Sequence, residues 1–298
     1  MRSDDRSLTA QVDRVIRATS FSSPEIDYYL YRPSSHAQHR RILVSVHGVS
    51  RNAEEHIQLF RPLADRYGAL LIAPLFTNRD FRDYQRLGRR KHGPRADLAL
   101  IRVLNEVALH IGCDTSCVDF FGFSGGAQFV HRFAMAHGTR VRRMVLGAAG
   151  WYTMPDDSLA YPHGIANARG LDAVRLSAKS ATRMPTLVLV GDQDDKNDDE
   201  ELNLSEVVCR TQGNNRVERA RAWQAAMNRY ASRHGLMPKV DLDLLNGVGH
   251  SFSQAVHAGS LADRVFSHLY GELEVVSRRW SEASMNPEQQ CQTVENVT

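Results

Sequence analysis

The stretch that decides the fold is CVDFFGFSGGAQFV, residues 117–130. Its first half is apolar enough to be a buried strand, and this strand stops at Gly122. A single serine, Ser124, then stands between Phe123 and a pair of glycines. A strand that leads through a glycine-rich turn into a helix is typical of parallel α/β sheets, in which ligands collect beyond the carboxyl ends of the strands. We therefore expect Ser124 to lie at the mouth of a binding site.

The rest of the chain alternates short apolar runs with longer amphipathic ones. Several runs are continuous in Val, Ile and Leu, as expected for strands that helices cover on both faces. We predict strands at 26–31, 41–47, 69–74, 118–123, 143–148, 186–191 and 240–245. We predict helices at 53–68, 95–112, 125–138, 216–235 and 253–271. This alternation predicts the α/β class, with an open, mostly parallel sheet of about eight strands and helices on both faces.

The 298 residues are expected to form one domain over 21–280. An N-terminal arm at 1–20, helical or loose, precedes this domain, and a flexible polar tail at 281–298 follows it. Two long segments, 151–183 and 195–215, interrupt the alternation of strands and helices. Because insertions of this length are usually functional or mobile, and both follow strand ends, we expect them near the binding site.

The composition excludes several classes of protein. A hydrophobic content of 42% with 24% charged residues is that of an ordinary globular protein. A net charge of +3 without interleaved aromatic residues gives no reason to expect nucleic acid. The N-terminus is charged where a signal peptide is apolar, and no run could span a bilayer, so we expect a cytoplasmic protein without membrane insertion. The four cysteines fit reduced thiols.

No dinucleotide, phosphate or metal motif occurs in the sequence, so we expect neither a cofactor nor a metal. A homodimer is left open.

Chemistry is suggested first by the pentapeptide Gly122–Gly126. It matches G-x-S-x-G, in which a strained strand-to-helix turn exposes the serine Oγ and glycines avoid collisions with the adjoining strand and helix. A glycine-rich turn with only a structural role could have the same sequence. Serine attack also needs a base, an orienting acid and a site for an oxyanion, so these must be sought elsewhere in the chain.

Candidates for the base and the acid follow the last two predicted strands. His250 comes after the strand 240–245 in GVGHSF, where glycines can let the imidazole approach the serine. The run GDQDD follows the strand before it and supplies Asp192, Asp194 and Asp195. A carboxylate there would fix the imidazole tautomer and stabilise the imidazolium. The residues alone do not choose among the three aspartates.

Candidates for the oxyanion site come from the loop HGVSRN, which ends the first buried strand. The backbone N–H groups around Val49, together with that of Gly125, are expected to face a developing oxyanion. Gly48 permits close approach of the backbone to a ligand, and Ser50 is a further candidate for substrate binding. His47 is expected to organise the loop rather than act as a second base.

Taken together, HGVSRN, GFSGG, GDQDD and GVGHSF resemble the α/β-hydrolase superfamily, in the neighbourhood of single-domain bacterial esterases and polyhydroxyalkanoate-depolymerase-like hydrolases. The resemblance runs over about residues 26–271 and keeps the superfamily's chain order of nucleophile, acid and histidine. It implies that Asp194 is the acid, with Asp192 and Asp195 as fallbacks. The oxyanion loop departs from the HGGG form, because Val49 and Ser50 follow its His-Gly pair.

The function expected on these grounds is that of a serine hydrolase. It would cleave carboxylic esters or thioesters through an acyl-enzyme on Ser124, with a small-molecule or polyester-type acyl compound as substrate. Acyl transfer or peptide cleavage on the same residues is an alternative, because a fold does not fix its substrate. A catalytically silent small-molecule receptor is the non-enzymatic alternative.

Three further features stand outside these motifs. Trp151 opens the first insertion and is expected either to line the substrate pocket or to pack the insertion. The arginine-rich loop 79–95 is interpreted as a solvated loop rather than an anion site. The helix 216–235 carries Arg216 and Arg219 near its start, and we interpret them as part of a salt-bridged outer face.

Overall fold

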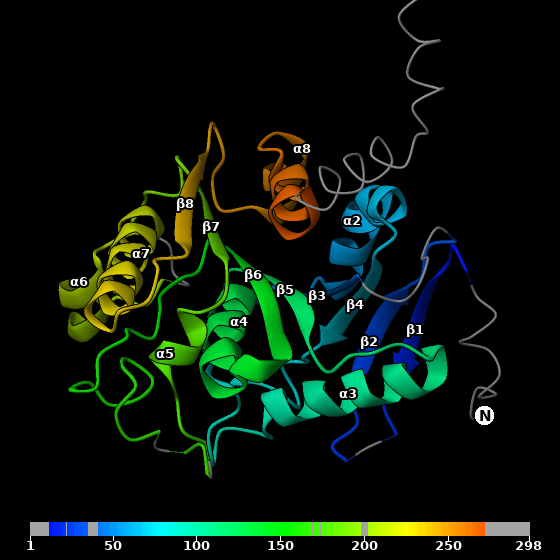
Figure 1. Cartoon of the computed structure of the whole chain (residues 1–298), viewed down its shortest axis with the longest axis horizontal. Coiled ribbons are helices and arrows are strands. Elements are labelled where there is room, and N and C mark those ends of the chain that lie inside the picture. The colour runs from blue at the N-terminus through cyan, green and yellow to red at the C-terminus, as the bar shows by residue number, and fades with distance from the viewer. Residues whose placement is uncertain are drawn as a thin grey trace, which may run out of the picture.

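The computed structural model describes residues 12–21, 23–34, 41–168, 170–172, 174–197 and 202–271. Its centre is one eight-stranded sheet with the strand order β1-β2-β4-β3-β5-β6-β7-β8 (Figure 1). The strands are β1 (Val15–Thr19), β2 (Asp27–Tyr31), β3 (Ile42–Val46), β4 (Leu70–Leu75), β5 (Val118–Phe123), β6 (Val141–Gly147), β7 (Thr186–Gly191) and β8 (Val240–Leu245). β2 runs antiparallel to its neighbours β1 and β4, and all other neighbours are parallel. The predicted open, mostly parallel sheet is confirmed.

Helices cover both faces of this sheet. They are α2 (Ala53–Tyr67), α3 (Ala96–Ile111), α4 (Gly125–Ala136), α5 (Ala178–Ala181), α6 (Glu206–Gln212), α7 (Arg216–Arg233) and α8 (Phe252–His257), with short 3₁₀ turns η1 (Tyr84–Arg86) and η2 (Gly138–Arg140). One core cluster joins a face of the sheet to α3, α4, α5 and α7, and a second joins the other face to α2, α8 and a helical segment at 261–271 (Figure 1). No helix in the described part of the chain combines the length and apolar character needed to span a bilayer.

The strand β3 illustrates why the central runs are apolar throughout. Successive side chains of a strand point to opposite faces, so Leu43 belongs to the second core cluster and Val44 to the first. All five positions of β3 are buried. Each large aliphatic side chain buried in this way stabilises the fold by about 1.5–3 kcal/mol.

The N-terminal part of the chain differs from expectation, because residues 15–19 are an edge strand rather than part of a helical or loose arm. β1 pairs with β2, and the side chains of Arg17 and Thr19 both donate hydrogen bonds of 2.6 Å to Asp27. This strand is only five residues long and partly exposed, so its apolar alternation is weak. Residues 1–11 of the expected arm, and the expected tail 281–298, lie outside the described residues.

The helix predicted over 253–271 is in fact two segments. α8 ends at His257, Ser260 has a left-handed backbone with φ of 52°, and the chain is helical again from 261 to 271. Gly and Ser are weaker helix formers than Ala, and they stand at the break. The break allows Leu261 and Phe266 to reach the second core cluster.

Gly126 in the turn after β5 is expected to be essential for stability. A Cβ atom at this position would lie 2.0 Å from the carbonyl oxygen of Val46 in β3. Overpacking against fixed backbone is costly, so we expect Gly126→Ala to lower the free energy of unfolding by about 3 kcal/mol or more. Urea unfolding followed by circular dichroism measures this loss.

Gly112→Ala is the matched control for this substitution. Gly112 has φ of 72° and nothing within 4 Å of a built Cβ, so only backbone strain opposes an alanine there. That strain costs about 1–2 kcal/mol. Equal losses in the two variants would contradict the tight contact between the turn and β3.

Candidate active site

The ends of four parallel strands meet at one edge of the sheet. Val49 follows β3, Ser124 follows β5, Asp194 follows β7 and His250 follows β8. Because these strands are parallel, their carboxyl ends lie on the same side of the molecule. Segments far apart in the sequence therefore come together around Ser124.

Ser124 occupies a strained turn between β5 and α4. Its backbone has φ of 52° and ψ of −114°, which is uncommon for a residue with a side chain, and its N–H donates to the carbonyl oxygen of Gly147 at 2.7 Å. Such strain costs about 1–3 kcal/mol and persists only where the surroundings enforce it. Gly122 helps to enforce it, because a Cβ atom there would lie 2.4 Å from the backbone of Gly126. The turn holds Ser124 at the N-terminus of α4.

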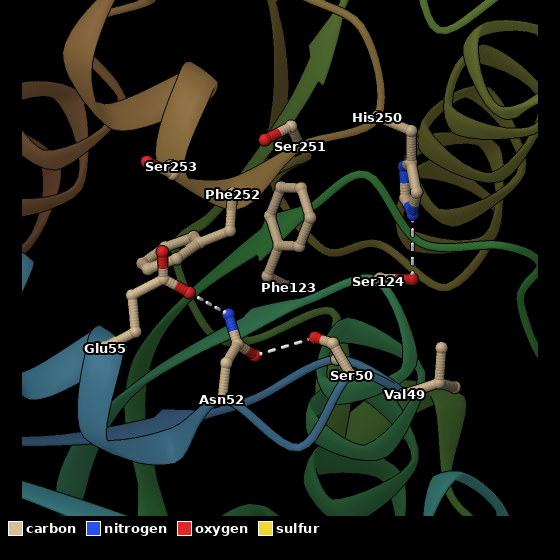
Figure 2. Close-up of a pocket in the computed structure, with 11 residues that line it drawn as sticks. Val49, Ser50, Asn52, Glu55, Phe123, Ser124, His250, Ser251, Phe252 and Ser253 are labelled. Atoms are coloured by element: carbon tan, nitrogen blue, oxygen red, sulfur yellow. Dashed lines mark hydrogen bonds between the residues drawn. The ribbon is translucent and has the colours of Figure 1, made fainter.

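A series of hydrogen bonds runs from this serine into the protein. His250 Nε2 lies 3.1 Å from Ser124 Oγ, and His250 Nδ1 lies 2.7 Å from Asp194 Oδ2; Figure 2 shows the ring of His250 aimed at the serine. A carboxylate only accepts hydrogen bonds, so Nδ1 carries the ring proton. Nε2 is then the nitrogen that can accept the proton of the Ser124 hydroxyl.

The three candidate aspartates have different surroundings. Asp194 is 3% exposed and contacts His250, whereas Asp192 and Asp195 are exposed. Asp192 Oδ1 accepts the N–H of Gly247 at 2.8 Å and so fixes the loop that leads to His250. The structure thus brings Asp194, rather than Asp192 or Asp195, next to the imidazole.

Arg216 is a member of the site that the sequence interpretation missed. Its Nη1 donates to Asp194 Oδ1 at 3.1 Å, and its side chain is only 2% exposed. The expected salt-bridged outer face is therefore wrong for both Arg216 and Arg219, because both are buried at the start of α7. Spacing could have revealed this, because Arg216 shares the buried face of the helix with Trp223 and Met227.

His47 organises the loop after β3. Its Nδ1 donates to the carbonyl oxygen of Gly48 at 2.7 Å, and its Nε2 accepts the N–H of Phe76 at 3.0 Å. Complete burial lowers the pKa of His47 to about 4. The ring is therefore neutral at pH 7, and both of its nitrogens are engaged in holding the loop.

The loop after β3 touches the turn that carries Ser124. A Cβ atom built on Gly48 would lie 3.4 Å from Ser124 Cβ, and one built on Gly125 would lie 3.2 Å from Val49 Cγ1. Gly125 is the first residue of α4, so its N–H has no partner within the helix. The side chain of Val49 therefore lies against Gly125, next to the turn that carries Ser124. Ser50 Oγ donates to Asn52 Oδ1 at 2.9 Å.

Two cavities open beside Ser124. The Glu55 cavity, of about 330 Å³, is lined by Gly48, Val49, Ser50, Asn52, Glu55, Phe123, Ser124, His250, Ser251, Phe252 and Ser253 (Figure 2). The Arg86 cavity, of about 320 Å³, is lined by Val49, Gln85, Arg86, Ser124, Gln128, Gly150, Trp151, Asn203 and Arg216. Val49 and Ser124 line both cavities, so a molecule bound across Ser124 would place one part in each.

The two insertions contribute to the Arg86 cavity. Trp151 belongs to the first insertion and Asn203 to the second, and both line this cavity. The indole of Trp151 also packs against Arg132, whose Cζ lies 4.3 Å from a ring centroid. Trp151 therefore both lines a cavity and packs the insertion. In the arginine-rich loop, Arg95 pairs with Asp97 at 2.5 Å, whereas Arg86 faces the cavity.

Comparisons with known proteins give structural matches only. No protein-family model and no curated protein sequence matches the chain. A poly(aspartic acid) hydrolase from Sphingomonas sp. KT-1 superposes with a TM-score of 0.72 at 24% identity, covering 85% of this chain and 99% of its own. A poly(3-hydroxybutyrate) depolymerase from Bordetella parapertussis gives 0.71 at 24% identity, covering 89% and 99%.

A more distant match is an S-formylglutathione hydrolase from Agrobacterium tumefaciens, with a TM-score of 0.57 at 15% identity over 86% of this chain and 94% of its own. At these identities the likeness concerns the arrangement of the backbone. The order and direction of the eight strands agree with it. The chain has the α/β-hydrolase fold, as its sequence motifs predict.

Proposed function

We propose that this protein is a serine hydrolase that cleaves carboxylic esters through an acyl-enzyme on Ser124. The observation that carries the proposal is the unbroken series of hydrogen bonds from Ser124 through His250 to Asp194, with distances of 3.1 Å and 2.7 Å. A nucleophile, a base and an orienting acid in this relation are what serine attack on an acyl carbon requires.

In the proposed reaction, Ser124 Oγ forms a bond to the acyl carbon while His250 Nε2 takes the hydroxyl proton. The carbonyl oxygen becomes an oxyanion, and the N–H groups of Val49 and Gly125 bind it beside the positive end of α4. Asp194 stabilises the imidazolium. His250 then gives its proton to the leaving alcohol as the carbon–oxygen bond breaks.

Deacylation uses the same residues with water in place of the alcohol. His250 takes a proton from water, the hydroxide forms a bond to the acyl carbon, and Ser124 leaves with the proton. Arg216 acts as a positioning residue, because its hydrogen bond to Asp194 Oδ1 keeps the other carboxylate oxygen on His250. The buried position of this pair favours a fixed geometry.

The comparisons support the class of reaction. The similar structures include a depolymerase of a polyester and a hydrolase of S-formylglutathione. We therefore include thioesters and polyester-type compounds among the substrates of this protein. Cavities of about 320–330 Å³ on the two sides of Ser124 suit short acyl and alcohol groups.

A fluorophosphonate probe tests the proposal directly. We expect one adduct per chain in the folded protein, and peptide mass spectrometry should assign it to Ser124. An activated serine is required for this reaction, so heat-denatured protein and the Ser124→Ala variant are controls that should stay unlabelled. A well-folded protein that takes up no probe and hydrolyses no p-nitrophenyl ester would instead be the silent receptor.

A further inference from the structure

Besides Gln85 and Ser124, which can both donate and accept, four polar side chains of the Arg86 cavity present hydrogen-bond donors. Arg86 and Arg216 have only donor groups. Gln128 Oε1 accepts from Arg132 Nη1 at 3.3 Å, which fixes the orientation of the amide. Its Nε2 lies beside Gly150, another residue of the cavity lining, because a Cβ atom built on Gly150 would be 3.1 Å from this nitrogen.

Asn203 is oriented in the same way. Its Oδ1 accepts the N–H of Ser205 at 3.0 Å, which orients the amide so that its NH₂ can donate to a ligand. Four lining side chains thus offer donors, and among the described residues no Asp or Glu lines this cavity. Such a lining suits a ligand group that only accepts hydrogen bonds, as a carboxylate does.

The charges around the cavity also favour an anion. Asp83 is shared by Arg86, whose Nη1 lies 2.8 Å from Oδ1, and by Arg89, whose Nε lies 2.9 Å from Oδ2. Burial alone would raise the pKa of Asp83, but the hydrogen bonds from Arg89 and Arg86 outweigh it and hold this pKa below its ordinary value. Two guanidinium groups therefore surround one carboxylate, which leaves one positive charge in excess.

Arg132 adds a second positive charge behind the wall formed by Gln128 and Trp151. This side chain is fully buried, and it donates hydrogen bonds to neutral oxygens of Thr153, Gln85 and Gln128. Its Nη2 has no hydrogen-bond partner among the described residues. Burial lowers the pKa of Arg132 to about 9, so the guanidinium is still protonated at pH 7.

The opposite cavity carries the opposite charge. Glu55 lines it together with Asn52, whose Nδ2 donates to Glu55 Oε2 at 2.5 Å (Figure 2). The leaving oxygen must take its proton from His250 Nε2, and His250 lines the Glu55 cavity rather than the Arg86 cavity. The alcohol half of an ester therefore belongs on the side of Glu55, and the acyl half on the side of Arg86.

We propose that the Arg86 cavity binds a carboxylate carried by the acyl half of the substrate. The preferred substrates are half-esters of dicarboxylic acids, in which the free carboxylate meets Arg86, Gln128 and Asn203 while the ester carbonyl lies at Ser124. This inference rests on the proposed ester hydrolysis and adds the chemical class of the acyl group. It also gives Arg86 a role in binding that a solvated loop would not have.

Three aryl esters test the inference. The first is the p-nitrophenyl half-ester of adipic acid, and the second is the same ester with the free acid replaced by a primary amide. The third has a neutral acyl group and a carboxylate on the phenol. We expect kcat/KM for the first to exceed that for the other two by about 10-fold or more, as charge-assisted hydrogen bonds in a partly buried site would give.

Substitutions at Arg86 locate the effect. The preference for the acyl carboxylate is measured as kcat/KM for the first ester divided by kcat/KM for the second. Arg86→Gln should lower this ratio by about 10-fold, and the ratio in Arg86→Lys should lie between those of the wild type and Arg86→Gln. Arg86→Glu should turn the preference toward an amine-capped acyl group. Arg82→Gln is the matched control, since Arg82 is an exposed arginine of the same loop that does not line the cavity, and it should leave the ratio unchanged.

Two results would overturn the inference while leaving ester hydrolysis intact. One is hydrolysis that depends on Ser124 but shows no preference for the acyl carboxylate, or prefers the carboxylate on the phenol. The other is an equal fall of the ratio in Arg82→Gln and Arg86→Gln. A different result would contradict the proposed function itself. In that case the wild type would hydrolyse none of the three esters any faster than Ser124→Ala does.

Discussion

Replacing Ser124 with alanine should lower kcat/KM for a p-nitrophenyl ester by a factor of about 10³ to 10⁶, as loss of the nucleophile does in serine hydrolases that use a catalytic triad. The substitution removes the only atom that joins the acyl carbon to His250 Nε2 in the proposed reaction. What remains is catalysis of direct attack by water. Initial rates over a range of substrate concentrations measure the loss.

The folded state of this variant should be preserved. Alanine and serine are both strained at a φ of 52°, so the exchange adds little backbone strain. Thermal unfolding should show a midpoint close to that of the wild type. Ser253→Ala is the matched control, because Ser253 lines the Glu55 cavity and has no place in the proposed chemistry. Wild-type turnover by Ser124→Ala would exclude the proposed nucleophile.

Replacing Asp194 with asparagine should lower kcat/KM by about 10³ to 10⁴, the size of effect found when a triad carboxylate becomes an amide. Asp194 now gives one oxygen to His250 Nδ1 and the other to Arg216 Nη1. An amide has only one oxygen, and Arg216 can only donate, so Arg216 will take it. The NH₂ group then faces Nδ1 and places the ring proton on Nε2, which can no longer accept the proton of Ser124.

Asp192→Asn and Asp195→Asn are the controls for this prediction. Both residues are exposed carboxylates of the same loop, so they test whether the loss comes from general charge or from the contact with His250. We expect each control to change kcat/KM by less than about threefold, as surface substitutions outside a reacting site usually do. Asp192→Asn qualifies because its amide oxygen can still accept the N–H of Gly247 that holds the loop before His250. An equal loss in Asp195→Asn would contradict the assignment of the acid. Circular dichroism of all three variants checks that they are folded.

The fold could be predicted where a strand is buried on both faces, because such a strand is a continuous apolar run in the sequence. The run ILVSV at β3 is apolar at almost every position because both core clusters need its side chains. β1 gives no such signal, because its five partly exposed residues form a strand through pairing with β2. The helix over 253–271 was predicted as one piece because its apolar pattern continues through a break that local propensity only weakly marks.

Some residues of the candidate site could likewise be predicted from local sequence, and others depend on contacts that are distant in sequence. Ser124 and His250 lie in short motifs whose glycines indicate tight turns, so both could be chosen as candidates from the sequence alone. The choice of Asp194 needed the resemblance to a superfamily, because three aspartates lie within four positions. Arg216 was missed because the burial of an arginine depends on a carboxylate 22 positions away. Its shared face with Trp223 was the one local sign of this burial.

In the proposed reaction, Val49 would contact both halves of the substrate. Its side chain is a common wall of both cavities, whereas Glu55 and Arg86 each border a single one. A bulkier or smaller residue at this position changes the room for the acyl group and for the alcohol at the same time. A substitution of Val49 that admits a new alcohol would therefore also change which acyl groups fit. A substitution of Glu55 or Arg86 would change the fit of one half of the substrate without changing the other.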